Sequence, residues 1–131
     1  NENLKITKKE IEEKGVKCLT VQGDVSSFED CEKCIKNIID EYGKIDVLVN
    51  NAGFGVHGLV TETNLEKDLE LIDLNITALH ILTKLFLSDM KKRNLGYILN
   101  VSSIAGFMPG PLMAEYYASK NFVLSYTKAI Y

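Results

Sequence analysis

Apolar residues in the first third of the chain recur at helical spacing, then at strand spacing, and then at helical spacing again. The pattern predicts a helix over 4–14, which a glycine follows, and a β-rich strand over 16–22. A second amphipathic helix is predicted to begin after Ser27, which stands where an N-cap would, and to end at Gly43. We therefore expect helix, strand and helix in this part of the chain.

The rest of the chain alternates short apolar runs with long amphipathic stretches. The runs 45–50 and 97–101 are almost unbroken, which is typical of parallel strands covered on both faces. Between them, 65–93 has helical periodicity with a break expected near Asn75, and a last helix runs from about Met113 to the end. Strands joined by such long crossovers must be parallel, so we predict an α/β fold with a doubly wound parallel sheet and helices on both faces.

The composition is that of an ordinary globular domain. Of the 131 residues, 46% are apolar and 25% are charged, and the net charge is −3. These values exclude a disordered or low-complexity chain, and the acidic balance argues against nucleic acid and anionic membranes as partners. The longest run without charged residues, 94–114, is interrupted by glycines, prolines and polar residues, so we expect no membrane span there.

The three cysteines favour a reducing compartment. They cannot all pair within one chain, and the first residues have no charged-then-apolar signal pattern, so we expect a cytoplasmic protein. We also expect residues before Asn1, because the chain has no initiator Met. Cys31 and Cys34 lie inside a predicted helix, and the remaining Cys and His residues are not in ligand spacing. They are therefore expected to be packing residues, with no metal site.

A tyrosine and a lysine near the end of the sequence could form an acid/base pair. Tyr116 and Lys120 are four positions apart, so on a helix they share a face. A lysine cation beside a phenol favours the phenolate, which would allow the tyrosine to exchange protons. The same spacing also occurs by chance on many helices, where it forms only a surface pair.

Further polar residues stand at the ends of apolar elements or inside them. Ser103 follows the last predicted strand, where its hydroxyl could donate to a substrate oxygen or close the strand with turn hydrogen bonds. Asn75 interrupts an apolar helical pattern, where an amide is either functional or solvent-facing. Asn50 and Asn51 could tie neighbouring strand ends together, and Gly53 would let a ligand approach the backbone closely.

In this order the motifs resemble those of the short-chain dehydrogenase/reductase family, classical type. The matching positions are Asn50–Gly53, Asn75, Ser103 and the Tyr116-x-x-x-Lys120 pair, with Asp24-Val25 after the preceding strand. The resemblance covers essentially all 131 residues, but the family's Gly-rich turn (Thr-Gly-x-x-x-Gly-x-Gly) and everything after Tyr131 are absent. It implies that 1–131 is the central part of a single, incomplete NAD(P)-binding Rossmann-like domain.

The resemblance implies a catalytic role for four residues. Tyr116 would protonate the carbonyl oxygen of the substrate, and Lys120 would favour that proton transfer and hold the nicotinamide ribose. Ser103 would bind and polarise the carbonyl. Asn75 would hold a water molecule that links Lys120 to solvent. Tyr116 and Lys120 would thus both contact the cofactor.

The resemblance also implies where the rest of the cofactor binds. Asp24 and Val25 would line the adenine pocket. Asn51, Ala52 and Gly53 would line the path of the adjoining ribose and diphosphate, and Asn51 would also hold strands together. The Gly-rich turn that receives the diphosphate in the family has no counterpart in this sequence.

The implied activity is hydride transfer between NADP or NAD, with NADP slightly favoured, and a carbonyl or alcohol substrate. Apolar pocket candidates indicate an apolar small molecule; they are Phe54, Val56, Phe107, Met108, Leu112 and Met113. The expected assembly is a homodimer or homotetramer that uses 65–93 and the last helix, with outward residues such as Ile81, Leu87 and Val123. Two alternatives stay open: a non-catalytic Rossmann-like binding module, and an inactive fragment of such an enzyme.

Overall fold

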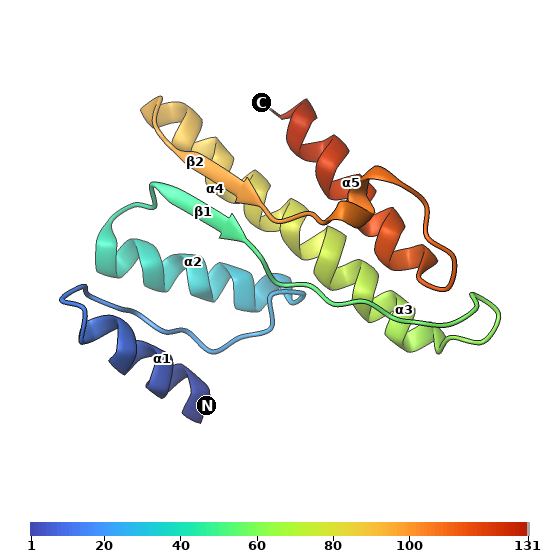
Figure 1. The fold of residues 1–131 in the computed structure, drawn as a ribbon. Coiled ribbons are helices and arrows are strands. Elements are labelled where there is room, and N and C mark those ends of the chain that lie inside the picture. The colour runs from blue at the N-terminus through green and yellow to red at the C-terminus, as the bar shows by residue number, and fades with distance from the viewer. Residues whose placement is uncertain (131) are drawn as a thin grey trace. The chain divides into compact units, whose positions relative to one another are not determined.

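A computed structural model describes residues 1–130 and divides the chain into two units, Asn1–Lys44 and Ile45–Tyr131, which are treated separately below (Figure 1). The first unit contains α1 (Glu2–Glu12) and α2 (Phe28–Tyr42). Helix α2 ends as the sequence predicts, whereas α1 ends at Glu12, two residues before the predicted end at position 14. The Ser27 hydroxyl accepts a hydrogen bond from the Asp30 N–H, and Gly43 closes α2 in the left-handed conformation with φ 76°.

The strand predicted over 16–22 is wrong. These residues connect α1 to α2 as extended backbone, and within the described chain they join no sheet. Their β-rich composition favours extended backbone, but a strand also needs a neighbouring strand to complete its hydrogen bonds. The local preference was therefore read correctly, whereas the pairing was not.

The second unit contains a two-stranded parallel sheet, formed by β1 (Val47–Asn50) and β2 (Tyr97–Asn100). Leu48 pairs with Ile98, and Asn50 pairs with Asn100. Helices cover one face of this sheet, where Leu48 and both asparagines are buried. The opposite face carries side chains that are each more than half exposed: Val47, Val49, Tyr97 and Leu99. This is part of a doubly wound parallel sheet, as the sequence predicts.

One continuous helical stretch crosses between the two strands. It consists of α3 (Leu65–Ile72), the π-helical turn η1 (Asp73–Ala78) and α4 (Leu79–Arg93). The break predicted near Asn75 is thus a local widening of the helix rather than an interruption. By length and composition alone this stretch could cross a membrane, but core helices pass the same test; α4 packs on both strands of the sheet, and 33% of the most apolar window is buried.

After β2 the chain forms the short 3₁₀ helix η2 (Ile104–Phe107) and then α5 (Ala114–Ala129). Helix α5 packs against η2, η1, α3 and β2, so it lies at the centre of the unit. Val123 was expected to point outward but is only 1% exposed. The inward side of α5 also carries Ser119 and Lys120, and Val123 follows them at helical spacing on the same side.

Asn50 and Asn100 form a buried polar connection between the two strands. Asn50 Nδ2 donates to Asn100 Oδ1 at 2.8 Å and to Thr83 Oγ1 of α4 at 3.0 Å. Asn100 Nδ2 donates to Thr127 Oγ1 of α5 at 3.0 Å. These hydrogen bonds join both strand ends to both covering helices, at the edge where the loops toward Gly53 and Ser103 begin.

Candidate functional site

Lys120 and Tyr116 lie together on the inward side of α5, as their spacing predicts. Lys120 is 6% exposed, and its Nζ lies 5.8 Å from the centroid of the half-buried Tyr116 ring. The same Nζ donates to the carbonyl oxygen of Val101, just beyond β2, at 3.0 Å. An ammonium group has three donors, and Val101 uses one of them. The helix and the end of the sheet therefore hold a cation beside the phenol.

Asn75 connects this helix to the loop that follows β1. Its Oδ1 accepts from the Phe54 N–H at 3.1 Å, and its Nδ2 donates to the Phe54 carbonyl at 2.9 Å. The second Nδ2 hydrogen goes to Ser119 Oγ at 3.0 Å, and that hydroxyl donates to the Tyr116 carbonyl at 2.7 Å. With 2% exposure, Asn75 acts in this structure as a clamp between the loop and α5.

Two glycines allow the loop after β1 to pass close to these side chains. A Cβ at Gly53 would lie 2.8 Å from Asn75 Oδ1 and 3.5 Å from Lys120 Nζ. A Cβ at Gly55 would lie 2.9 Å from Met113 Cε and 3.2 Å from Tyr116 Cδ2. The backbone of this loop, from Gly53 to Gly55, therefore forms one wall of the site.

Ser103 lies three residues beyond β2, as the N-cap of η2. Its Oγ accepts from the Ala105 N–H at 3.2 Å, so the predicted turn hydrogen bond is present. The hydroxyl keeps its own proton for another acceptor, and the structure thus permits both of the roles considered from the sequence. The preceding hydroxyl, of Ser102, donates to the Lys120 carbonyl at 2.8 Å and ties this segment to α5.

The side chain that joins β1 to β2 is that of Asn50, whereas the strand-holding role expected of Asn51 stays a prediction. Side chains alternate between the faces of a strand, so only one of two adjacent amides can enter the buried face. Asn51, Ala52 and Gly53 are all exposed, at the carboxyl end of β1. They are therefore free to meet a ligand along the edge of the sheet.

Asp24 and Val25 lie in the first unit and form the turn that leads into α2. Asp24 Oδ1 accepts from the N–H of Ser26 at 2.9 Å and from its hydroxyl at 2.7 Å. The hydrogen bond from the Ser26 hydroxyl is the main cause that lowers the pKa of the exposed Asp24 carboxyl below its ordinary value, and the bond from the Ser26 N–H is the second. The Val25 carbonyl accepts from Cys31 Sγ at 3.1 Å. The turn is thus ordered from within its own unit.

The thiols have the properties of packing residues. Cys31 is 2% exposed, and desolvation on burial raises its pKa, as it does that of Cys34. A raised pKa disfavours the thiolate, which is the form that attacks electrophiles and binds metals. No group of side chains suited to a metal ion occurs in the described part of the chain.

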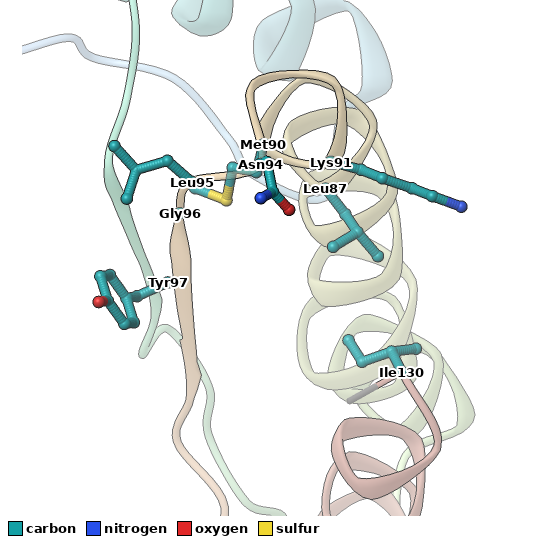
Figure 2. Close-up of a pocket in the computed structure, with 8 residues that line it drawn as sticks. All are labelled: Leu87, Met90, Lys91, Asn94, Leu95, Gly96, Tyr97 and Ile130. Carbon is teal, nitrogen blue, oxygen red and sulfur yellow. The ribbon is translucent and has the colours of Figure 1, made fainter.

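Two surface hollows lie away from the Tyr116–Lys120 pair. One, of about 560 Å³, lies at the amino end of β2 and is lined by residues of α4, the turn after it and Ile130 (Figure 2). Another, of about 430 Å³, lies between Pro109–Pro111 and the side of α5 that carries Tyr117 and Asn121. Neither hollow is lined by Tyr116 or Lys120.

Sequence reasoning missed three residues that hold the site together. Ser119, Ser102 and Asn121 bond to backbone carbonyls on or beside α5. For Ser119 a signal was available, because a small polar residue three positions after Tyr116 lies on the same face of the helix as Tyr116. For Ser102 and Asn121 there was none, since the segment after β2 and α5 are brought together only by tertiary packing.

Comparison with known proteins identifies the family to which the chain is similar. The family model for short chain dehydrogenases matches residues 1–131. A 3-oxoacyl-[acyl-carrier-protein] reductase of Synechocystis sp. is 37% identical over 121 residues, which are 92% of this chain and 49% of that protein. Glucose 1-dehydrogenase 2 of Bacillus subtilis is 34% identical over 122 residues, which are 92% of this chain and 47% of that protein. The chain thus spans about half the length of these relatives.

Solved structures agree on the fold. An NAD⁺-bound xylitol dehydrogenase matches with a TM-score of 0.91 at 30% identity, over 98% of this chain and 50% of that one. A short-chain dehydrogenase/reductase from Burkholderia phymatum in complex with NAD matches with a TM-score of 0.92 at 28% identity, over 98% and 46%. The chain therefore belongs to the short-chain dehydrogenase/reductase family and has part of that family's Rossmann-type α/β fold.

Proposed function

We propose that the protein containing this chain is a nicotinamide-dependent oxidoreductase that interconverts a carbonyl compound and an alcohol, with Tyr116 as the acid/base. The observation that supports this most directly is the meeting of Tyr116, Lys120 and Asn75 beside the exposed loop backbone from Gly53 to Gly55. A binding module would not need a lysine buried beside a tyrosine at the carboxyl end of a parallel sheet. That edge is where ligands bind in doubly wound folds.

Each proposed role follows from the chemistry of a side chain. In the reduction direction, Tyr116 transfers its hydroxyl proton to the carbonyl oxygen as negative charge develops there, which leaves a tyrosinate. Lys120 stabilises that tyrosinate through its cation, and Ser103 donates its hydroxyl proton as a hydrogen bond to the same oxygen. In the oxidation direction, the tyrosinate accepts the proton of the alcohol. The bound nicotinamide supplies or accepts the hydride.

The residues present fit a nicotinamide dinucleotide. The exposed backbone at Asn51, Ala52 and Gly53 offers a surface without bulky side chains, and Lys120 has donors left for the hydroxyl groups of a ribose. Asp24 and Val25 are proposed to line the adenine. The matched structures have NAD bound and, in one from Beutenbergia cavernae, NADP. NADP is our proposed preference for this protein, and titration with both cofactors tests it.

Asn75 is proposed to support the site in two ways. Its amide clamps the Phe54 backbone, and its remaining oxygen lone pair is the one position at which the side chain could still bind the expected water molecule. We keep the water link between Lys120 and solvent as a prediction. Asn75→Ala should weaken both the hydrogen bonds to the Phe54 backbone and the water link. If only the hydrogen bonds to Phe54 matter, the variant should have a changed cofactor affinity but an unchanged pH profile of kcat.

The acid/base assignment is tested by Tyr116→Phe in the intact protein, with Tyr117→Phe as the matched control. We expect kcat for a series of aldehydes and ketones to fall by about 10²–10⁴ in Tyr116→Phe, because the proton donor is lost while the ring remains. Tyr117→Phe should leave kcat unchanged, since the Tyr117 ring lies over Gly110 on another side of α5. Wild-type activity in Tyr116→Phe would contradict the assignment. Cofactor binding without any carbonyl reduction by the wild type would favour the binding module.

The substrate and the assembly are further proposals. Apolar residues near the site, including Phe54, Met108 and Met113, favour an apolar carbonyl compound.

We propose a homodimer or homotetramer formed through α4 and α5, where His80 Nδ1 lies 3.1 Å from Tyr126 Oη and the half-buried Phe122 ring stacks on Tyr126. A monomer in light scattering at micromolar concentration would contradict it. The free cysteines support a cytoplasmic location, which fractionation of the source cells would test.

A further inference from the structure

We propose that Asn121 is a positioning residue that holds Ser103 in place against α5. This inference rests on the proposed function, in which the Ser103 hydroxyl contacts the substrate oxygen. Asn121 directly follows Lys120 on α5, on the side of the helix that meets η2 and the loop after it. The argument depends on the contacts of one amide group and on the short helix that it supports.

The Asn121 amide joins α5 to the segment that follows Ser103. Its Nδ2 lies 3.1 Å from the Ala105 carbonyl oxygen, 3.2 Å from that of Met108 and 2.8 Å from that of Tyr117. Two N–H donors are therefore shared among three acceptors. One of these acceptors is in η2, one directly follows η2, and one is in the preceding turn of α5, so the amide binds η2 and α5 together.

Helix η2 needs such a partner because it is a single 3₁₀ turn, Ile104–Phe107. The carbonyl groups at the end of a helix have no following turn to bond them and require other donors. Close packing also holds η2: a Cβ at Gly106 would lie 2.6 Å from Ser102 Oγ and 2.8 Å from the Lys120 carbonyl oxygen. Asn121 adds hydrogen bonds to the Ala105 and Met108 carbonyl groups on either side of this contact.

The geometry of η2 in turn determines the position of Ser103. The Ser103 carbonyl accepts from the Gly106 N–H at 3.0 Å, and its Oγ accepts from the Ala105 N–H at 3.2 Å. Ser103 therefore cannot keep its backbone and side-chain geometry if η2 unwinds. Release of the Ala105 and Met108 carbonyl groups is expected to displace the Ser103 hydroxyl from the substrate oxygen, while Tyr116, Lys120 and the Gly53 loop keep their own contacts.

The first test needs no enzymatic activity. Asn121→Asp has the shape of asparagine but places carboxylate oxygens against the carbonyl oxygens, and Asn121→Ala removes the donors without adding charge. Hydrogen exchange of the intact protein, followed by mass spectrometry, should show faster exchange in peptides covering 102–109 for both variants and unchanged exchange in β1 and α4. The control Asn37→Asp adds the same charge at an exposed position of α2 and should change neither.

The second test compares kcat with the NADPH dissociation constant, which separates a displaced Ser103 hydroxyl from a general loss of structure. We expect kcat to fall by about 10–100-fold in both variants, because small displacements of a reacting group have effects of this size. The NADPH dissociation constant should change by less than about 2-fold, because the cofactor contacts are not disturbed. If Asn121→Asp does not fold, Asn121→Ala provides the measurement.

The outcomes distinguish this inference from the function on which it rests. Unchanged exchange over 102–109 in Asn121→Ala would overturn the inference, whatever the activity of the protein. Equal losses of NADPH affinity and kcat would also overturn it, because they would indicate a general structural role. Full activity in Tyr116→Phe would contradict the proposed acid/base chemistry instead and would leave the exchange result standing.

Discussion

Replacement of Gly53 by alanine is expected to disturb both stability and cofactor binding. The new methyl group would lie 2.8 Å from Asn75 Oδ1, whereas ordinary van der Waals contact begins at 3.4 Å. This overlap of about 0.6 Å has to be relieved by a shift of Asn75 or of the loop. Asn75 cannot move freely, since it is buried and holds the Phe54 backbone and Ser119 through three hydrogen bonds.

The magnitude follows from these constraints. Overpacking of a buried site destabilises a protein by about 1–3 kcal/mol, and each hydrogen bond lost adds about 1 kcal/mol. We therefore expect Gly53→Ala to lower the free energy of unfolding by about 2 kcal/mol. Because the same methyl group would stand on the exposed loop backbone that is proposed to meet the cofactor, beside Lys120, we also expect NADPH affinity to fall by about 10-fold.

The assay is urea unfolding of the intact protein, followed by circular dichroism, together with a fluorescence titration with NADPH. A double-mutant cycle supplies the control, since Asn75→Ala removes the oxygen that the methyl group meets. In that background the cost of Gly53→Ala should be smaller by about 1 kcal/mol or more. An equal cost in both backgrounds would show that the clash with Asn75 is not the cause.

Three further predictions concern other contacts. Asn50→Ala and Asn100→Ala should each lower the free energy of unfolding by about 1–3 kcal/mol in urea titrations, because each breaks the hydrogen bond between the two amides and leaves one buried polar atom of the remaining amide unpaired, and their effects should not add. Ser26→Ala should raise the pKa of Asp24 toward its ordinary value in an NMR titration, although the backbone N–H at position 26 still lowers it. Since that pKa is lowered in the folded protein, its contribution to stability is present at neutral pH and is lost as the pH falls through the folded-state pKa, and the variant should show a smaller loss. Gly106→Ala should reduce kcat by pushing η2 away from α5, and unchanged kinetics would contradict the close packing described there.

Local signals in the sequence were sufficient for the helices and for most of the site. Ser27 and Gly43 are capping residues whose effect depends on their own neighbours in the chain, so the bounds of α2 could be predicted closely. Tyr116 and Lys120 were placed together because helical spacing alone sets their geometry. The position of Asn75 was also predicted, although not the π-helical turn or the bonds to Phe54.

Features that depend on distant segments could not be predicted. The extended stretch 16–22 has strand-forming residues, but whether it pairs is decided by other parts of the chain. The choice between Asn50 and Asn51 depends on which face of β1 the helices cover, and the pattern of an almost uniformly apolar strand does not show this. Asn121 lacks any local signal, because the carbonyl groups it binds are brought to it by tertiary packing.

The paired amides of Asn50 and Asn100 also determine how the two strands align during folding. Val-Leu-Val and Tyr-Ile-Leu are so similar in character that shifted pairings would bury nearly as much apolar surface. A shift by one residue would place one amide opposite a valine and break the hydrogen bond between the two amides, at about 1–3 kcal/mol for each buried polar atom left unpaired. Misaligned pairings of β1 and β2 are therefore unfavourable. Because Asn50 stays paired with Asn100, the loops that carry Gly53 and Ser103 begin at the same level along the two strands.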